Sequence, residues 1–323
     1  MSYEDFLQRA ISVVRVASSM SKTVQKRFRQ ETGTLSKMDT SPVTVADFAV
    51  QALILSELDD GTFKFIAEET SAQLKENSEL LKDVTDTVNS ALPGRPALSE
   101  NQICGAIDLG SYAGGDSLLT WVLDPVDGTK GFMRMEQYCI ALGLLDRGKV
   151  VLGVLGCPNL PFDADETGCI FYAQSGSGAF CVSVDGTHTP RQIKVSARED
   201  VSTCRFMESV ESAHSSFEQS AKVASILGVK EPPLRMDSQC KYGALARGDG
   251  QIYMRFPRAG YEENIWDHAA GSIVIEEAGG TVTDGIGHPL DFGLGRKMKN
   301  EGGIVATNGV FHEAVICAVK EVL

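Results

Sequence analysis

Two aspartates three residues apart, Asp124 and Asp127, stand in the segment WVLDPVDGTKGF. The apolar run 121–123 before them predicts a buried strand, and Pro125 predicts a turn where the chain leaves the sheet. The two carboxylates and the intervening Val126 carbonyl can then face one point. This is the all-oxygen environment that magnesium prefers, so the spacing predicts a divalent-metal site.

The residues that follow, Gly128 and Thr129, suit a phosphate, because free backbone N–H groups at the start of a segment bind anions. Two other acidic motifs fail on spacing. An EF-hand loop needs glycine at its sixth position, and Gly128 is fifth counted from Asp124. An aspartyl-phosphate enzyme of the DxDGT type needs a nucleophilic aspartate two residues before Asp127, where Pro125 stands. A turn with an aspartate as helix cap remains as the structural alternative.

Further acidic residues stand at the ends of other predicted elements. Glu68 and Glu69 follow the apolar run 63–67, which predicts a second buried strand. Asp267 comes directly before the helical pattern HAAGSIVIEEAG, and Asp47 lies in the first turns of another predicted helix. Each could be an ordinary cap or a response to the helix dipole. Together they predict a site assembled at the edge of a layered fold.

These motifs resemble the lithium-sensitive, magnesium-dependent phosphatase superfamily that includes inositol monophosphatase and fructose-1,6-bisphosphatase. The metal signature stands as DPVDGT at 124–129 and the second signature as WDHAAG at 266–271, after Glu68 and Glu69. Within the superfamily, the chain is most similar to the 3'(2'),5'-bisphosphate nucleotidases. The indications are KGF at 130–132, where inositol phosphatases usually carry Asn before the Phe, and the segments MDSQCKYGALARG and YEENIWDHAAG. The similarity extends from SPVTVADFAVQ to the late segment VATNG.

The resemblance implies a set of metal ligands. Glu68, Asp124 and the Val126 carbonyl would hold one Mg²⁺, and Asp124, Asp127 and Asp267 a second, with two or three ions in each active site. Paired metals stabilise both the entering and the leaving oxygen of an in-line displacement.

The resemblance also implies the catalytic and substrate-binding residues. Asp47 and Thr129 would act together on the nucleophilic water, so no covalent intermediate is needed. Taken without the resemblance, the basic members of the substrate set could equally be solvated surface charges, and the histidine a loop residue. The residues implied to contact the substrate are Gly128, Thr129, His214, Ser238, Lys241, Arg255 and Asp267.

The implied activity is removal of the 3'-phosphate from 3'-phosphoadenosine 5'-phosphate, giving AMP and phosphate. The 2' isomer and 3'-phosphoadenylyl sulfate are expected as further substrates, and lithium as an inhibitor. One alternative is an inositol polyphosphate 1-phosphatase or inositol monophosphatase, because the metal site is shared and only the recognition residues choose the substrate. Another is a nucleotide-binding protein that kept the fold and lost the chemistry.

Composition is consistent with a globular enzyme. The chain has 323 residues, of which 43% are hydrophobic and 23% charged, and a net charge of −13. This charge argues against nucleic-acid polymers and anionic membranes as partners, and a polyanionic small substrate would need metal to offset repulsion. The eight cysteines form no CxxC pair and predict reduced core thiols. No apolar run has membrane length. We therefore expect a cytoplasmic protein, and a monomer.

The predicted elements fall into two lobes with the active site between them. Residues 1–195 form a metal-binding α+β lobe: a long first helix that ends before residue 31, a helix over 45–58, an insertion of helix and loop over 77–115, and antiparallel strands over 138–184. Residues 196–323 form an α/β lobe with strands near 206, 252 and 304 and helices over 215–227, 240–247, 267–278 and the C-terminus. The resemblance implies the layered α-β-α-β-α sugar-phosphatase fold, an α/β class.

Overall fold

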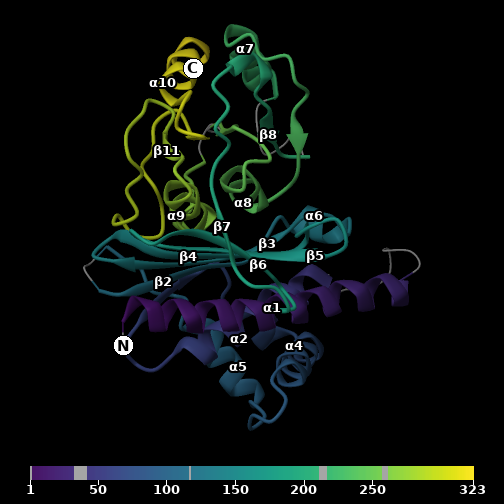
Figure 1. Ribbon diagram of the computed structural model, residues 1–323. Helices are drawn as coiled ribbons and strands as arrows, with labels where there is room; N and C mark the ends of the chain where they lie inside the picture. The colour runs from purple at the N-terminus through teal and green to yellow at the C-terminus, as the bar shows by residue number, and fades with distance from the viewer. Residues whose placement is uncertain (1, 33–41, 116–117, 211–216, 257–260) are drawn as a thin grey trace.

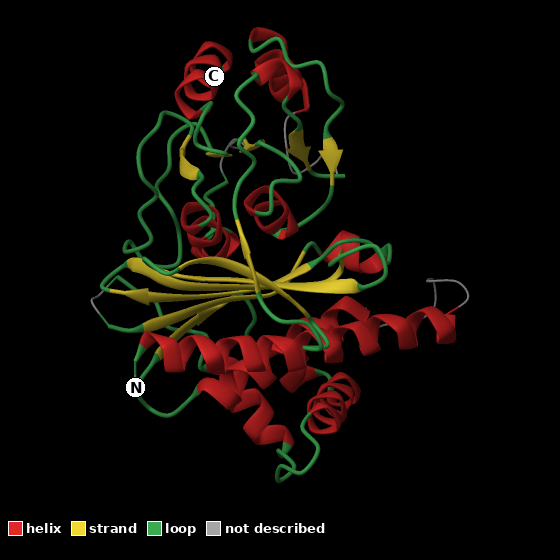
Figure 2. Cartoon of the chain, in the orientation of Figure 1, coloured by secondary structure: helices red, strands yellow, loops and turns green. Residues whose placement is uncertain are grey.

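The computed structural model describes residues 2–32, 42–115, 118–210, 217–256 and 261–323. Two β-sheets alternate with three helical layers, which gives the order α-β-α-β-α (Figure 1). Figure 2 shows the large sheet across the middle of the molecule with helices on both of its faces. The layered α/β fold that the resemblance implied is confirmed.

The first half of the chain builds the outer helices and the large sheet. Its helices are α1 (Tyr3–Thr32), α2 (Pro42–Leu58), α3 (Ala72–Glu76), α4 (Ser78–Ala91), α5 (Glu100–Asp108) and α6 (Thr129–Met133). Its strands are β1 (Lys64–Ala67), β2 (Thr120–Asp127), β3 (Cys139–Asp146), β4 (Lys149–Pro161), β5 (Thr167–Gln174), β6 (Gly178–Ser183) and β7 (Arg191–Ile193). These strands lie side by side in chain order, and only β1 and β2 are parallel.

The second half builds the smaller sheet and the remaining helices. The strands are β8 (Phe206–Glu208), β9 (Leu234–Arg235), β10 (Ile252–Arg255), β11 (Thr281–Asp284) and β12 (Ile304–Thr307), in the order β11-β12-β10-β8-β9. The helices are α7 (Phe217–Ile226), α8 (Cys240–Ala246), α9 (Ala269–Glu277) and α10 (His312–Val322). Helices α8 and α9 lie between the two sheets, and α7 and α10 form the far outer layer (Figure 1).

Helix α2 explains how the first helical layer is held. It is apolar on nearly all sides, and side chains such as Phe48, Leu53 and Leu55 are fully buried. A helix with this pattern must be covered all round. In the structure α1, α4, α5 and strand β2 surround it. Helices α4 and α5 come from the segment 77–115, so this insertion supplies cover for α2.

Small residues allow the middle helices to lie close to the large sheet. A Cβ atom at Gly153 of β4 would stand 2.5 Å from Ile273 of α9, and one at Gly271 of α9 would stand 2.4 Å from the Tyr242 ring of α8. Neither position tolerates a larger side chain without a shift of its neighbours. This close packing fixes the start of α9 against the large sheet.

The predicted elements agree with the structure in type and order, with three differences. The helix expected to open at Asp267 begins at Ala269, after a 3₁₀ turn over Ile265–Asp267. Strands β7, β9 and β11 and the short helices α3 and α6 were not predicted. The chain also does not leave the sheet at Asp124, because β2 continues to Asp127. The division into lobes at residues 195 and 196 stays a prediction.

Candidate active site

The parallel pair β1 and β2 brings two of the predicted metal ligands together. Ala67 pairs with Leu123 across these strands, so the next residues, Glu68 and Asp124, stand at the same edge of the sheet. The carboxyl ends of parallel strands are a frequent place for polar ligands to bind. Asp124 is almost completely buried, at 2% exposure.

A β-bulge places Asp127 beside Asp124. Asp124 pairs with Ala141 and Asp127 with Cys139, so three steps along β2 match two steps along β3. Residues three apart in a regular strand face opposite sides, and the extra residue turns Asp127 back to the side of Asp124. The predicted turn at Pro125 was wrong, because a bulge accommodates proline, which has no N–H to contribute to the ladder.

The turn after β2 makes close contact with the second half of the chain. Gly128 has a φ of +90°, and a Cβ atom there would stand 2.8 Å from Cβ of Ser238. Ser238 itself has a φ of +67°, which is uncommon for a residue other than glycine. Strained backbone of this kind occurs often at functional sites. Here it joins the Gly128–Thr129 turn to the start of α8.

The predicted site residues line one pocket of about 270 Å³. Ten of those predicted are in its wall: Glu68, Asp124, Val126, Asp127, Gly128, Thr129, Ser238, Lys241, Arg255 and Asp267. Seven more residues complete the lining: Lys130, Ser209, Asp237, Gln239, Tyr253, Tyr261 and Asn264. His214, predicted to contact the substrate, lies outside the described residues.

The acidic end of the pocket carries concentrated negative charge. Burial and the neighbouring acidic groups raise the pKa of Asp124 well above its usual range. Loss of hydration and the charges of Glu69 and Asp267 raise the pKa of Glu68 to about 8, although the residue as a whole is exposed. Burial and Asp267 raise the pKa of Asp127 to about 6. Burial and mutual repulsion among the carboxylates therefore both favour their neutral forms.

The donor set fits magnesium. Glu68, Asp124, Asp127 and Asp267 offer carboxylate oxygens, and Val126 offers its carbonyl. Oδ1 of Asp124 is buried and has no hydrogen-bond partner among the described residues. A buried acceptor without a donor is costly, and a hard cation would satisfy it.

The backbone beside Glu68 is fixed by two residues that sequence reasoning missed. The Gln51 side chain accepts from N–H of Glu69 at 3.0 Å and donates to its carbonyl at 2.8 Å. Arg296 donates to the Ala67 carbonyl at 2.6 Å. A lone glutamine in a helix and a lone arginine in a loop carry no motif, so only the folded chain reveals these roles.

Asp47 stands next to this acidic group and not in the pocket wall. It lies in α2, which packs against α6, the helix that begins at Thr129. Burial and the charges of Glu69 and Glu68 raise the pKa of the Asp47 carboxyl well above its usual range. Among the described residues, Asp47 and Thr129 make no hydrogen bond to each other, so joint action on a proton would need a water between them.

The pocket is also lined by basic side chains, Lys241 and Arg255. Lys241 in α8 is only 3% exposed and donates to Ser209 Oγ at 3.3 Å and to the Met236 carbonyl at 3.2 Å. Its ammonium group also lies 5.4 Å from the centre of the Tyr253 ring. Burial lowers the pKa of Lys241 to about 8. The alternative of a solvated surface charge is therefore wrong for this lysine.

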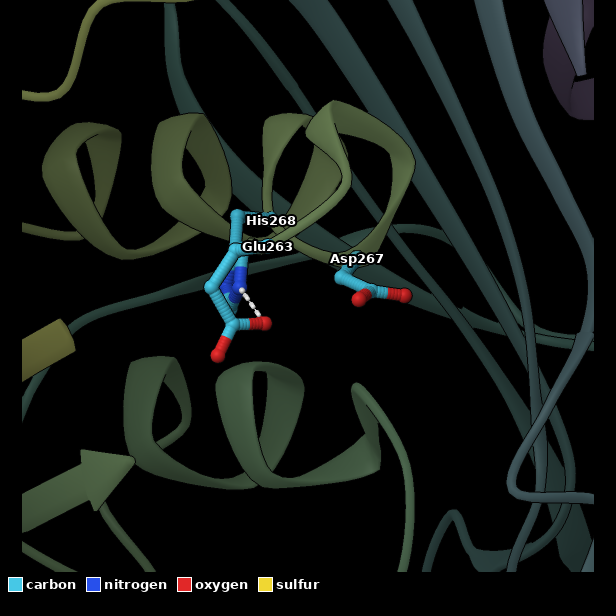
Figure 3. A group of neighbouring side chains, drawn as sticks. All are labelled: Glu263, Asp267 and His268. Carbon is cyan, nitrogen blue, oxygen red and sulfur yellow. Dashed lines mark hydrogen bonds and ion pairs between the residues drawn. The ribbon is translucent and has the colours of Figure 1, made fainter. Parts of the chain in front are cut away.

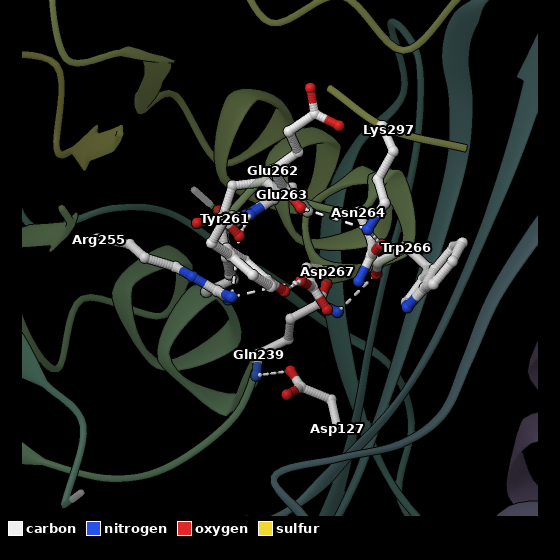
Figure 4. A network of polar contacts seen from close by, with 12 residues as sticks. Asp127, Gln239, Arg255, Tyr261, Glu262, Glu263, Asn264, Trp266, Asp267 and Lys297 are labelled. Carbon is white, nitrogen blue, oxygen red and sulfur yellow. Dashed lines mark hydrogen bonds and ion pairs between the residues drawn. The ribbon is translucent and has the colours of Figure 1, made fainter. Parts of the chain in front are cut away.

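Arg255 lies at the end of β10, between acidic groups (Figure 4). Its Nη2 is 2.8 Å from Glu263 Oε2 and 3.3 Å from Asp267 Oδ2. Tyr261 OH is 3.4 Å from the same Asp267 oxygen. The arginine is therefore anchored, with its side chain 23% exposed, and is not a freely solvated charge.

Buried groups continue the network behind Glu263. Nε2 of His268 is 3.3 Å from Glu263 Oε2, and Nδ1 of His268 is 2.8 Å from Tyr242 OH. Figure 3 shows Glu263 and His268 in contact, with Asp267 to one side. Glu263 and His268 both lie in the segment YEENIWDHAAG, but neither was predicted as a site residue.

Asp127 has a backbone partner that was also missed. N–H of Gln239 donates to Asp127 Oδ2 at 2.6 Å (Figure 4), and the Gln239 side chain donates to the Trp266 carbonyl at 2.9 Å. Gln239 thus connects one predicted metal ligand to the residue before another, Asp267. Gln239 lies between Ser238 and Lys241 in the segment MDSQCKYGALARG. Its place between two predicted site residues is the feature of the sequence that could have indicated its role.

The model of the inositol monophosphatase family matches residues 3–323. The chain belongs to the inositol monophosphatase family. Members are generally magnesium-dependent, in agreement with the oxygen donor set, and the resemblance that the motifs indicated is confirmed.

Several curated relatives carry one name. Proteins named 3'(2'),5'-bisphosphate nucleotidase are 44% identical in Oryza sativa, over 99% of this chain and 95% of the relative, and 39% identical in Schizosaccharomyces pombe, over 98% and 95%. One from Arabidopsis thaliana is 45% identical over 86% and 85%. An inositol monophosphatase structure from Anabaena shares the fold, with a TM-score of 0.62 and 22% identity over 100% of this chain and 98% of the other.

Proposed function

We propose that the protein is a 3'(2'),5'-bisphosphate nucleotidase, a phosphomonoesterase that converts 3'-phosphoadenosine 5'-phosphate to AMP and phosphate. The 2' isomer and 3'-phosphoadenylyl sulfate are further substrates, and lithium inhibits. One observation supports this most: a single pocket is lined both by four carboxylates and by the cations Lys241 and Arg255. A substrate with two phosphates can place one where the carboxylates would hold metal and the other against a basic side chain. The relatives' names support the nucleotide as the substrate.

The metal ligands in this proposal are Glu68, Asp124, Asp127, Asp267 and the Val126 carbonyl. Magnesium, when bound there as two or three ions, lowers the pKa of a bound water and neutralises charge on the attacking and leaving oxygens. The unpartnered Oδ1 of Asp124 supports this assignment.

The protein's own groups then handle the proton and the phosphate. The Asp47 carboxylate accepts the proton of the nucleophilic water through the Thr129 hydroxyl, which requires the water-mediated contact described above. The oxygen of this water forms the new bond to phosphorus, the bond from phosphorus to the ribose 3'-oxygen breaks, and the leaving oxygen takes a proton from solvent to become the 3'-hydroxyl of AMP. N–H groups of the Gly128–Thr129 turn face the phosphate.

The basic side chains of the pocket, with Ser238, position the rest of the nucleotide. Lys241 lies toward the 5'-phosphate, Ser238 contacts the sugar or base, and Arg255 pairs with phosphate through its planar guanidinium. His214 belongs to the same set. The low exposure of Lys241 supports this role, because a buried ammonium group is retained at a cost to stability.

Product analysis tests the proposal. After limited reaction with 3'-phosphoadenosine 5'-phosphate and Mg²⁺, chromatography should show AMP and phosphate in equal amounts. Adenosine 3'-phosphate as the product would mean cleavage at the other phosphate and would contradict the assigned orientation.

We also propose that the protein is a cytoplasmic monomer that binds neither nucleic-acid polymers nor membranes. All eight cysteines are free thiols, as a reducing compartment would favour. Within the described ranges, no helix combines the length and hydropathy needed to cross a bilayer. The net charge of −13 opposes contact with polyanions.

A further inference from the structure

Arg255 is shared unequally between two carboxylates. Its Nη2 forms an ion pair with Glu263 Oε2 at 2.8 Å and donates a longer hydrogen bond to Asp267 Oδ2 at 3.3 Å (Figure 4). The second donor to that Asp267 oxygen, Tyr261 OH, is longer still at 3.4 Å. Glu263 is therefore the nearer partner of the guanidinium, which also pairs with Asp267 at the longer distance.

Glu263 is itself held in place from behind. Its side chain is 5% exposed and contacts Nε2 of His268, which is fully buried, and His268 in turn contacts Tyr242 OH. The Glu263 backbone carbonyl accepts from N–H of Met298 at 2.9 Å. Because these partners are fixed by packing, the carboxylate cannot follow Arg255 if the arginine moves toward the pocket.

These acidic groups do not form a separate metal site. Ligand atoms of Glu263, Asp267 and His268 lie within 4.8 Å of one another, close enough to suggest a cation between them. The Arg255 nitrogen already supplies positive charge to both carboxylates. Glu263 is therefore a partner of the arginine and not a ligand of magnesium.

We propose that Glu263 is a positioning residue that limits how closely Arg255 pairs with Asp267. Asp267 then keeps its carboxylate for the metal, and the guanidinium stays directed at the substrate phosphate. Without the Glu263 charge, Coulomb attraction would draw Arg255 onto Asp267, where it would compete with the cation. The role of Arg255 at phosphate rests on the proposed function, whereas its competition with the metal rests on the contacts alone.

The test compares two neighbouring glutamates. Glu263→Gln keeps the size of the side chain and removes its charge. Glu262→Gln makes the same change one residue earlier, on an exposed side chain. Isothermal titration of each metal-free protein with Mg²⁺ measures affinity without turnover. We expect Glu263→Gln to weaken Mg²⁺ binding by about 10-fold or more and to raise KM for the nucleotide, while Glu262→Gln stays near wild type.

A double-mutant cycle shows whether Glu263 acts through Arg255. In an Arg255→Met background, Glu263→Gln should leave the Mg²⁺ affinity unchanged, because no guanidinium remains to compete. Equal Mg²⁺ affinities in Glu263→Gln and Glu262→Gln would overturn the proposal. So would a loss of Mg²⁺ affinity in the Arg255→Met background as large as the loss that Glu263→Gln causes in the wild-type background. If Glu263→Gln does not fold, Tyr242→Phe replaces it, since that change reaches the carboxylate only through His268. Mg²⁺ affinity equal to wild type in Tyr242→Phe would then overturn the proposal.

The same experiment separates this inference from the proposed function. A wild-type protein that binds Mg²⁺ but releases no phosphate from the nucleotide contradicts the function. The titrations of the glutamate variants still decide the role of Glu263 in that case.

Discussion

Replacing Lys241 with methionine tests whether the buried ammonium group in the pocket lowers the free energy of unfolding. Lys241 is 3% exposed, and burial lowers its pKa from 10.5 to about 8, against the opposing charges of Asp127 and Asp237. In the unfolded chain the pKa returns to its ordinary value. The unfolded state therefore binds more protons between pH 8 and 10.5, so the penalty on folding is full below about pH 8 and fades toward pH 10.5.

The size of the effect follows from these two values. Their difference corresponds to a penalty of about 3 kcal/mol at pH 7. Methionine has similar length but donates no hydrogen bond. The Ser209 hydroxyl and the Met236 carbonyl each lose a long contact, of 3.3 and 3.2 Å, at a combined cost of about 1–2 kcal/mol. We therefore expect Lys241→Met to stabilise the metal-free protein by about 1–2 kcal/mol at pH 7.

Urea unfolding with EDTA and a thiol reductant, at pH 7 and pH 10, measures this difference. The stability difference between Lys241→Met and wild type should be smaller at pH 10, because Lys241 is already neutral in the folded protein at that pH. Lys82→Met, on an exposed position of α4, is the control and should change stability by less than about 0.5 kcal/mol. A Lys241→Met protein less stable than wild type at pH 7, or a difference equal at both pH values, would refute the reasoning. Turnover should show a raised KM for the bisphosphate substrate.

Three further substitutions have expected outcomes. Asp124→Asn should reduce turnover by more than about 100-fold and weaken Mg²⁺ binding, because it removes a buried carboxylate that the proposed metals share. Phosphate release and calorimetric Mg²⁺ affinity measure the two effects. If both stay unchanged, the proposed metal site is wrong. Gly131→Ala should cost about 3 kcal/mol or more, since its Cβ would stand 2.0 Å from the Gln137 carbonyl oxygen. Gly105→Ala in α5, with no atom within 4 Å of its Cβ, should instead gain about 0.5 kcal/mol, and urea unfolding of the two variants checks both.

The elements that sequence predicted well are those with long, regular patterns. Helix α2 is a continuous apolar segment, and strands β3 to β6 are apolar runs separated by turn residues. Strand β11 was missed because it has four residues, TVTD, directly after two glycines, too short for alternation to be recognised. The bulge in β2 was missed because Pro125 suggests a turn, and only the pairing with β3 shows that the strand continues.

Some site residues could likewise be predicted from sequence patterns, and others could not. Asp124, Asp127 and Asp267 belong to recognisable motifs at the ends of predicted elements. The sequence could therefore predict that their side chains meet in one site. Glu263 acts through Arg255 and His268, and Gln51 through the backbone of Glu69, contacts that no residue spacing in the sequence indicates. Which carboxylate an arginine prefers depends on distances of a few tenths of an ångström, and these follow from tertiary packing.

Phosphate release from 3'-phosphoadenosine 5'-phosphate and from inositol 1-phosphate, measured side by side with magnesium and then with EDTA, tests the central claim most directly. The account predicts a much higher kcat/KM for the nucleotide and loss of both activities on chelation. Preference for inositol 1-phosphate would keep the metal site but contradict the roles of Ser238, Lys241 and Arg255. Activity that persists in EDTA would contradict the metal site itself.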